Sequence, residues 1–156
     1  MTEKIWIYVL SKELGDDEQK QFLKNCSDFT GSWTAHDQPL AAGFELYKNR
    51  LLIMKVDESA YNASGCSIDK LQRFIQQQEK EFGIELLNRF LVALEVNNNL
   101  MVLHSSKIKE LLINNTINED VLVFDTTITS SADMKDWKKP LKNTWLCKYI
   151  PGLSSK

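Results

Sequence analysis

Short apolar runs recur along the chain at lengths typical of strands. The first, Ile5 to Leu10, is rich in β-branched and aromatic residues, as expected for a strand that is buried on both faces. Two pairs of runs follow, 44–47 with 51–56 and 90–96 with 100–103, and a turn-forming tripeptide separates the members of each pair. They predict two β-hairpins, whose turns are Lys48-Asn49-Arg50 and Asn97-Asn98-Asn99.

Apolar residues spaced by three and four positions predict three helices. The first covers about 16–27 and begins with three acidic residues, which favour a helix N-terminus. The second covers 68–82 and stops at Gly83, and a short third helix covers 108–112. A final short strand is expected at 121–124.

Two segments lack a clear period. Residues 28–42 contain glycine, proline and polar residues and are expected to form the longest irregular loop. The tail from Ser130 carries Trp137 and Trp145, and this aromatic surface predicts that the tail packs back on the domain.

The order strand, helix, hairpin, helix, strand predicts an α+β fold. It matches the ferredoxin-like βαββαβ arrangement, an antiparallel sheet with its helices on one face. An extra hairpin strand and a helical C-terminal tail would be added to that core. With no linker or internal repeat, residues 1–156 are expected to form one domain.

Composition narrows the classes of function. The apolar share of 43% is ordinary for a globular protein, and the net charge of −2 provides no basic field for nucleic acid. The three cysteines form no C-x-x-C pair, which favours a reducing compartment over a disulfide framework. The first apolar run is short for a signal peptide, and no run is long enough to span a membrane. The expected location is therefore the cytoplasm, without membrane insertion.

The predicted topology brings two loops to one end of the sheet. Trp33 and His36, in the loop after the first helix, would then approach Asp57 and Cys66, which precede the second helix. Cys66 at a helix start suggests a thiolate nucleophile, with His36 as base and Asp57 as the orienting carboxylate. The alternative is that Cys66 is a small buried residue and that Asp57 bonds to Ser59 in a turn.

A ligand site is also expected at this loop end. Ser67 is a plausible N-cap of the second helix, and Asp69 would lie in its first turn. The predicted ligand-binding residues are Trp33, Glu58, Ser64, Ser67 and Asp69.

The sequence contains neither a metal-binding motif nor a phosphate-binding motif. The two histidines, His36 and His104, are isolated, so no metal site is predicted, and no particular cofactor is indicated. No Gly-Lys dipeptide occurs, so the phosphate-binding Walker A loop is absent.

Four segments spread over nearly the whole chain resemble a family of uncharacterised small bacterial cytoplasmic proteins. Members of that family are often labelled automatically as ABC transporter ATPases. The missing Walker A loop argues against such an activity, and Ala63 to Ser67 is only a distant echo of the L-S-G-G-Q signature. The resemblance implies a single cytoplasmic domain and no particular reaction. The segments are Gly31 to His36, Val56 to Ser59, Ala63 to Asp69 and Ile117 to Asp120.

The leading hypothesis is a binding or accessory domain. Its contacts with a small ligand or a protein would be made by residues 29–42 and 57–67, and a homodimer could form through a sheet edge. The alternative is a thiol-dependent hydrolase or transferase that uses Cys66.

Overall fold

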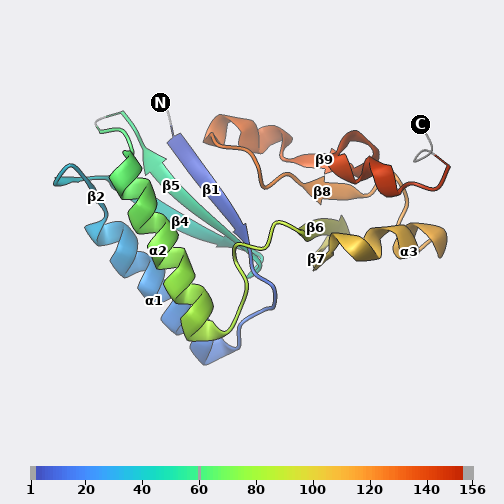
Figure 1. Ribbon diagram of the computed structural model, residues 1–156, viewed down its shortest axis with the longest axis horizontal. Helices are drawn as coiled ribbons and strands as arrows, with labels where there is room; N and C mark the ends of the chain where they lie inside the picture. The colour runs from blue at the N-terminus through green and yellow to red at the C-terminus, as the bar shows by residue number, and fades with distance from the viewer. Residues whose placement is uncertain (1–2, 60, 153–156) are drawn as a thin grey trace.

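The structure is a computed structural model and describes residues 3–59 and 61–152. The chain is a mixed α+β protein, as the sequence predicts. Its longer strands lie in two antiparallel sheets, one in each half of the chain (Figure 1). None of the helices in the described ranges is long and apolar enough to cross a membrane.

The N-terminal half is a three-stranded sheet with two long helices on one face (Figure 1). The strand order is β1-β5-β4, and both pairs are antiparallel. A hairpin of two-residue strands, β2 (Thr34–Ala35) and β3 (Gln38–Pro39), joins the first helix to β4. The main elements are β1 (Glu3–Val9), α1 (Asp16–Ser32), β4 (Ala41–Tyr47), β5 (Leu51–Asp57) and α2 (Gly65–Phe82).

The C-terminal half is built on a four-stranded sheet with the order β7-β6-β8-β9. Its helix, α3 (Ile108–Ile113), follows a 3-10 turn at Ser105–Lys107. Further 3-10 turns cover Ser131–Asp136, Leu141–Asn143 and Trp145–Tyr149. The strands are β6 (Leu91–Val96), β7 (Asn99–His104), β8 (Leu122–Phe124) and β9 (Lys138–Pro140).

Alternating side chains of the strands supply three apolar clusters. Leu52 and Met54 of β5 face the helices, whereas Leu51 and Ile53 point to the opposite face of the first sheet. That opposite face shares a cluster with Ala93 and other residues of the second sheet. On its other face, the second sheet packs against α3 and the C-terminal 3-10 turns. A continuous apolar core therefore links the two halves.

Both predicted hairpins are present, and their turns use left-handed backbone conformations. Lys48 and Asn49 have φ angles of 48° and 62°, and Asn97 and Asn98 have φ angles of 52° and 66°. Asparagine tolerates this region better than most residues do. The predicted aromatic tail also packs back on the domain, with Trp137 buried between the two sheets.

The first helix is longer than the sequence predicts. It continues through residues 28–32, and the rest of the expected loop forms the β2–β3 hairpin and the first two residues of β4. Two contacts favour the extension. Phe29 stacks on Phe74 of α2 at a ring distance of 4.4 Å, and Thr30 Oγ1 donates a hydrogen bond to the Cys26 carbonyl. Tertiary packing thus stabilises a segment whose local composition resembles a loop.

The strand at 90–96 differs from its position in the predicted ferredoxin-like order. That order would place it beside β1, but it is β6 and pairs with β7 and β8 in the second sheet. Leu94 and Ala93 are fully buried on its two faces, so β6 needs cover on both sides. The C-terminal half provides both neighbouring strands and covers the Leu94 face, whereas the first sheet covers the Ala93 face.

Candidate functional site

Trp33 lies at the centre of the loop end that the sequence singles out, but it is a core residue. Only 2% of its surface is exposed, and its ring lies against Trp6 and Phe29. Its indole Nε1 donates a hydrogen bond to the Ser67 carbonyl oxygen at 2.9 Å. This hydrogen bond joins the two predicted loops. It is made by the side chain of Trp33, which is one of the predicted ligand-binding residues.

The two serines at the start of α2 form a capping box. Ser64, not Ser67, is the N-cap, and its hydroxyl accepts a hydrogen bond from the Ser67 N–H. The Ser67 hydroxyl accepts in turn from the Ser64 N–H at 2.7 Å, and Ser67 is fully buried. Because the helix begins at Gly65, Asp69 lies beyond the first turn and is exposed. Both serines thus serve the helix terminus.

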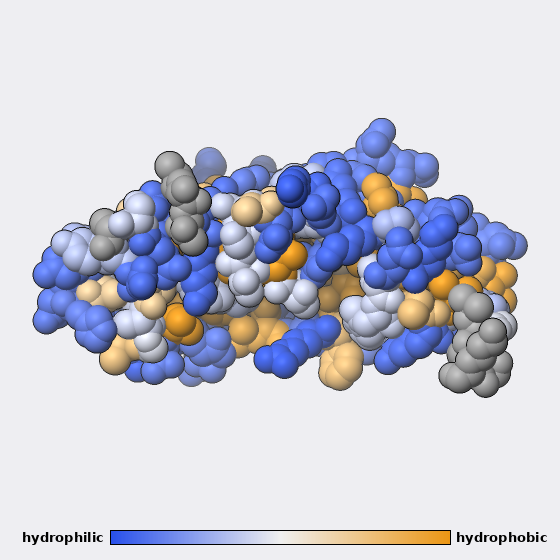
Figure 2. Space-filling view, turned by 90° about the horizontal axis from the view of Figure 1, so that it is seen from above, coloured by the Kyte–Doolittle hydropathy of each residue, from blue (hydrophilic) through white to orange (hydrophobic). Residues whose placement is uncertain are grey.

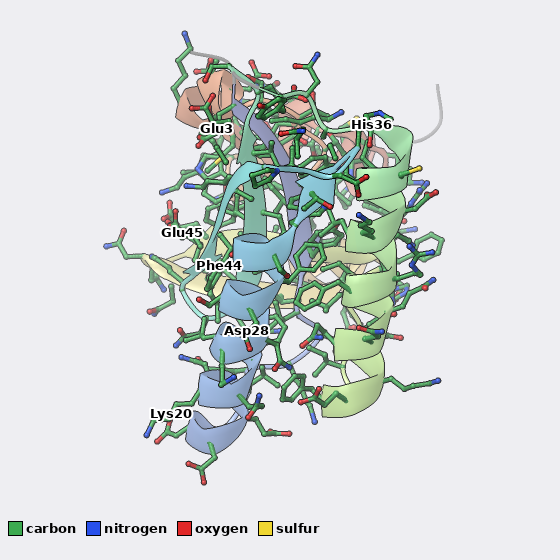
Figure 3. The ribbon with its side chains drawn as sticks, turned by 90° about the vertical axis from the view of Figure 1, so that its left-hand side faces the viewer. Glu3, Lys20, Asp28, His36, Phe44 and Glu45 are labelled. Atoms are coloured by element: carbon green, nitrogen blue, oxygen red, sulfur yellow. The ribbon has the colours of Figure 1, made fainter. Side chains whose placement is uncertain are left out.

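The three predicted catalytic residues are at the same end of the molecule without forming a hydrogen-bonded set. Cys66 is exposed, contrary to the alternative that it is a buried packing residue. His36 is also exposed, in the β2–β3 turn near the start of α2 (Figure 3), with a φ angle of 51°. Among the described residues, no hydrogen bond joins the side chains of His36, Cys66 and Asp57. The thiol is accessible, and it has no hydrogen bond to a base within the described part of the chain.

The acidic residues of this loop end close turns. Asp57 Oδ1 accepts a hydrogen bond from the Ser59 N–H at 2.9 Å, which confirms the turn expected from the sequence. This hydrogen bond lowers the pKa of Asp57, because it favours the ionised carboxylate. Glu58 Oε2 accepts from the Ala63 N–H at 2.7 Å and thereby closes the loop that leads to α2. Both carboxylates hold backbone in place.

A cavity of about 670 Å³ opens elsewhere, between the two halves of the molecule. Its walls come from one side of β1, the connection from α2 to β6, the end of β8, β9 and the C-terminal 3-10 turns. We call this cavity the cleft. Apolar residues are also visible near the middle of the surface in Figure 2, between more hydrophilic regions. The lining of the cleft combines apolar positions such as Leu87 with polar ones such as Asn88 and Thr126.

The charged groups of the cleft leave one cation without an ionic partner. Lys139 Nζ lies 2.6 Å from Asp125 Oδ2, and the Asp125 Oδ1 atom accepts a hydrogen bond from the Thr127 N–H. Burial would raise the pKa of Asp125, but the hydrogen bonds from Lys139 and Thr127 outweigh it and keep that pKa below its usual value. Arg89 is exposed and forms no ion pair within the described ranges. The charged side chains of the lining, Arg89, Lys139 and Asp125, therefore include one more cation than anion.

Tyr8 also lines the cleft. Burial raises the pKa of its phenol above the usual value of about 10, so the group stays protonated at neutral pH. Trp145, with 49% of its surface exposed, contributes an aromatic ring to the same lining. These groups can donate hydrogen bonds and contact an apolar portion of a ligand.

Sequence patterns do not indicate this site, because its residues are scattered along the chain. They come from segments centred near 8, 72, 89, 125, 139 and 144, and none of these segments has a recognisable motif. The available signals are the Asn88-Arg89 pair before a buried strand and Asp125-Thr126-Thr127 after another one. Polar residues at the ends of strands are common, so neither signal indicates a site by itself.

Comparisons with known proteins do not assign the chain to a family. No protein-family model matches it, and neither the curated proteins nor the solved structures contain a significant match.

Proposed function

We propose that this protein is a non-catalytic ligand-binding domain and that its ligand, which carries a negative charge, occupies the cleft. The observation that supports this proposal most directly is the cleft of about 670 Å³, whose lining contains Arg89, a cation with no ion pair among the described residues. Small-molecule sites typically have volumes of about 300–1,000 Å³ and combine an apolar lining with a few polar groups. The cleft has a volume within this range and a lining of this mixed kind.

The internal bonds of the cleft support binding rather than catalysis. Lys139 and Asp125 neutralise each other, and the bonded Asp125 carboxylate is a weaker base than a free one. Arg89 supplies a guanidinium group, which binds anions and is rarely a proton donor or acceptor in catalysis. The remaining polar groups are amides and hydroxyls, which orient a ligand without reacting with it.

The proposal is tested with Trp145 as an intrinsic fluorescent probe. Small anions, from acetate to N-acetylglutamate and nucleotides, are titrated into the protein while tryptophan fluorescence and the melting temperature are recorded. We expect saturable binding that Arg89→Glu weakens at least about tenfold, since a repulsive charge replaces an attractive one. Arg73→Glu is the matched control, because Arg73 is exposed on α2 outside the cleft. Equal effects of the two substitutions would refute the cleft as the site.

A second candidate function is a thiol-dependent hydrolase or transferase that uses Cys66. The exposure of Cys66 in the first turn of α2 favours it, because a nucleophilic thiol must be accessible to its substrate. The test is the rate of alkylation as a function of pH in the wild type and in His36→Ala. Cys26 is an internal control, since it is buried and burial raises its pKa to about 12. A midpoint at the free-thiol value of about 8.5 in both proteins would exclude an activated thiol.

Three further expectations remain proposals. We propose that the N-terminal half is related to ferredoxin-like domains, because β1-β5-β4 and its two helices follow the first part of that arrangement. The free state of Cys26, Cys66 and Cys147 supports a cytoplasmic location. The free edge of β7, which carries no Asp, Glu, Lys or Arg, supports a homodimer, for which sedimentation is the test.

A further inference from the structure

Within residues 3–59 and 61–152, the outer edge of β1 has backbone partners at both ends but not in the middle. The N–H of Ile5 donates a hydrogen bond to the Thr129 carbonyl at 3.0 Å, and an isolated antiparallel bridge joins Lys4 to Ser130. Just beyond the other end of the strand, the N–H of Ser11 donates to the Glu85 carbonyl at 3.0 Å. The opposite edge of β1 is fully paired with β5.

The direction of the backbone groups between these two points follows from strand geometry. In an antiparallel strand, the N–H and C=O of one residue point to the same side, and successive residues alternate. Ile5 points outward, so Ile7 and Val9 also point outward, whereas Leu10 donates to Arg50 on the β5 side. Among the described residues, no backbone group pairs with the outward groups of Ile7 or Val9.

These two residues line the cleft. Ile7, Tyr8 and Val9 form one of its walls, facing the segment from Val123 to Thr127. That segment converges on the start of β1, where Thr129 bonds to Ile5, and it diverges toward the end of the strand (Figure 1). The cleft is thus the space beside β1 in which a fourth strand of the first sheet would lie.

A free strand edge inside a cleft differs from one on the surface. Backbone N–H and C=O groups are strong hydrogen-bonding groups. Those of Val9 belong to a buried residue, of which only 6% of the surface is exposed. The outward groups of Ile7 and Val9 are about 7 Å apart, the two-residue repeat of any extended chain. A strand that enters the cleft can therefore pair with both residues in register.

We propose that the cleft binds an extended acidic segment of a partner protein, which adds to the first sheet as a fourth strand beside β1. This inference rests on the proposed function of the cleft as a ligand site. The segment runs antiparallel to β1, as the bridge between Lys4 and Ser130 already does. About five of its residues fit between the closed ends at Ile5 and Ser11.

The walls of the cleft specify which segment fits. Successive side chains of the added strand point to opposite faces of the sheet, one toward Gln72 of α2 and the next toward Phe124 of the second sheet. Arg89 selects an acidic side chain, since it is the cation of the cleft that has no ion pair among the described residues. Main-chain hydrogen bonds supply affinity, and these contacts supply specificity.

The test begins with a library of five-residue peptides, capped at both ends, in which each member contains one glutamate. The library is selected on the immobilised full-length protein, and the best peptide is resynthesised in two forms, unmodified and with alternate amides N-methylated. We expect the unmodified peptide to bind and the N-methylated form to bind at least about tenfold more weakly, because methylation removes main-chain donors. Capping removes the terminal carboxylate, so binding requires the acidic side chain.

Amide hydrogen exchange then identifies the edge that the peptide pairs with. We expect bound peptide to slow the exchange of the Ile7 and Val9 amides at least about tenfold, with little change at Ile5 and Ser11, which are already bonded. If small anions bind in an Arg89-dependent way but no peptide protects Ile7 and Val9, the strand inference is wrong and the proposed function stands. If neither anions nor peptides bind, both proposals are wrong.

Discussion

The loop end around Trp33 and the cleft around Arg89 are both rich in polar residues, but they use them in opposite ways. At the loop end, the indole of Trp33, the two capping serines and the carboxylates of Asp57 and Glu58 all bond to the protein itself. In the cleft, the Arg89 side chain and the outward backbone of Ile7 and Val9 have no such partner among the described residues. The first region therefore uses its polar groups for structure, and the second keeps some of them available.

This difference explains why attractive residue types alone are poor guides to function. Tryptophan, serine, histidine and cysteine close together in the sequence look like a site, yet most of these side chains stabilise the junction between α1 and α2. Substitutions at the loop end should therefore reduce stability, whereas substitutions in the cleft should mainly reduce binding.

The largest effect is expected for Trp33→Ala, which should lower the free energy of unfolding by about 3–5 kcal/mol. The substitution removes a buried ring from contact with Trp6 and Phe29 and breaks the bond to Ser67. Urea unfolding monitored by circular dichroism measures the change. Trp145→Ala is the matched control, because half of the Trp145 surface is exposed. Similar losses in the two variants would contradict the structural role of the loop end.

A smaller loss is expected for Ser67→Ala, about 1–2 kcal/mol in the same measurement. The change removes the hydroxyl that accepts from the Ser64 N–H and donates to the Ser64 carbonyl in a buried position. Asp69→Ala, on an exposed position of the same helix, should change stability by less than about 0.5 kcal/mol. If the free energy of unfolding of Ser67→Ala equals that of the wild type, the capping box is dispensable.

Acid should weaken the cleft through Asp125. Its folded-state pKa is lowered, so its contribution is present above the unfolded value of about 3.9 and is lost as the pH falls through the folded value. The ion pair with Lys139 is partly exposed, which limits the contribution to about 1 kcal/mol. Between pH 6 and pH 2, the free energy of unfolding of the wild type should therefore fall by up to about 1 kcal/mol more than that of Asp125→Asn. Parallel pH profiles from urea titrations would contradict this role.

The smallest effect on folding is expected for Arg89→Glu, less than about 0.5 kcal/mol at neutral pH. The side chain is exposed and forms no ion pair with the described residues, so folding does not depend on its charge. The same variant should lose anion binding, which separates the two regions by measurement. A loss of more than about 1 kcal/mol in the melting or urea data would place Arg89 among the structural residues.

Elements with strong local patterns were predictable from the sequence. The strand at β1, the two hairpins and α2 were expected close to their observed positions, because alternation, turn residues and helical spacing act over short distances. The end of α1 was not predictable, since it depends on the stacking of Phe29 on Phe74, which is 45 positions away in the chain. The place of β6 depended likewise on partners from the C-terminal half.

The sequence by itself determined the α+β class, the order of the main elements and the approach of Trp33 to the start of α2. It could not determine whether a strand pairs with the outer edge of β1. The reason is that strand pairing depends on which distant segments bury β6. Only the tertiary structure therefore decided that, among the described residues, the outer edge of β1 stays open at Ile7 and Val9 and that Arg89 lies in the same cleft. The physical reason is that local patterns specify each element, whereas burial and hydrogen bonding between elements specify which polar groups remain free.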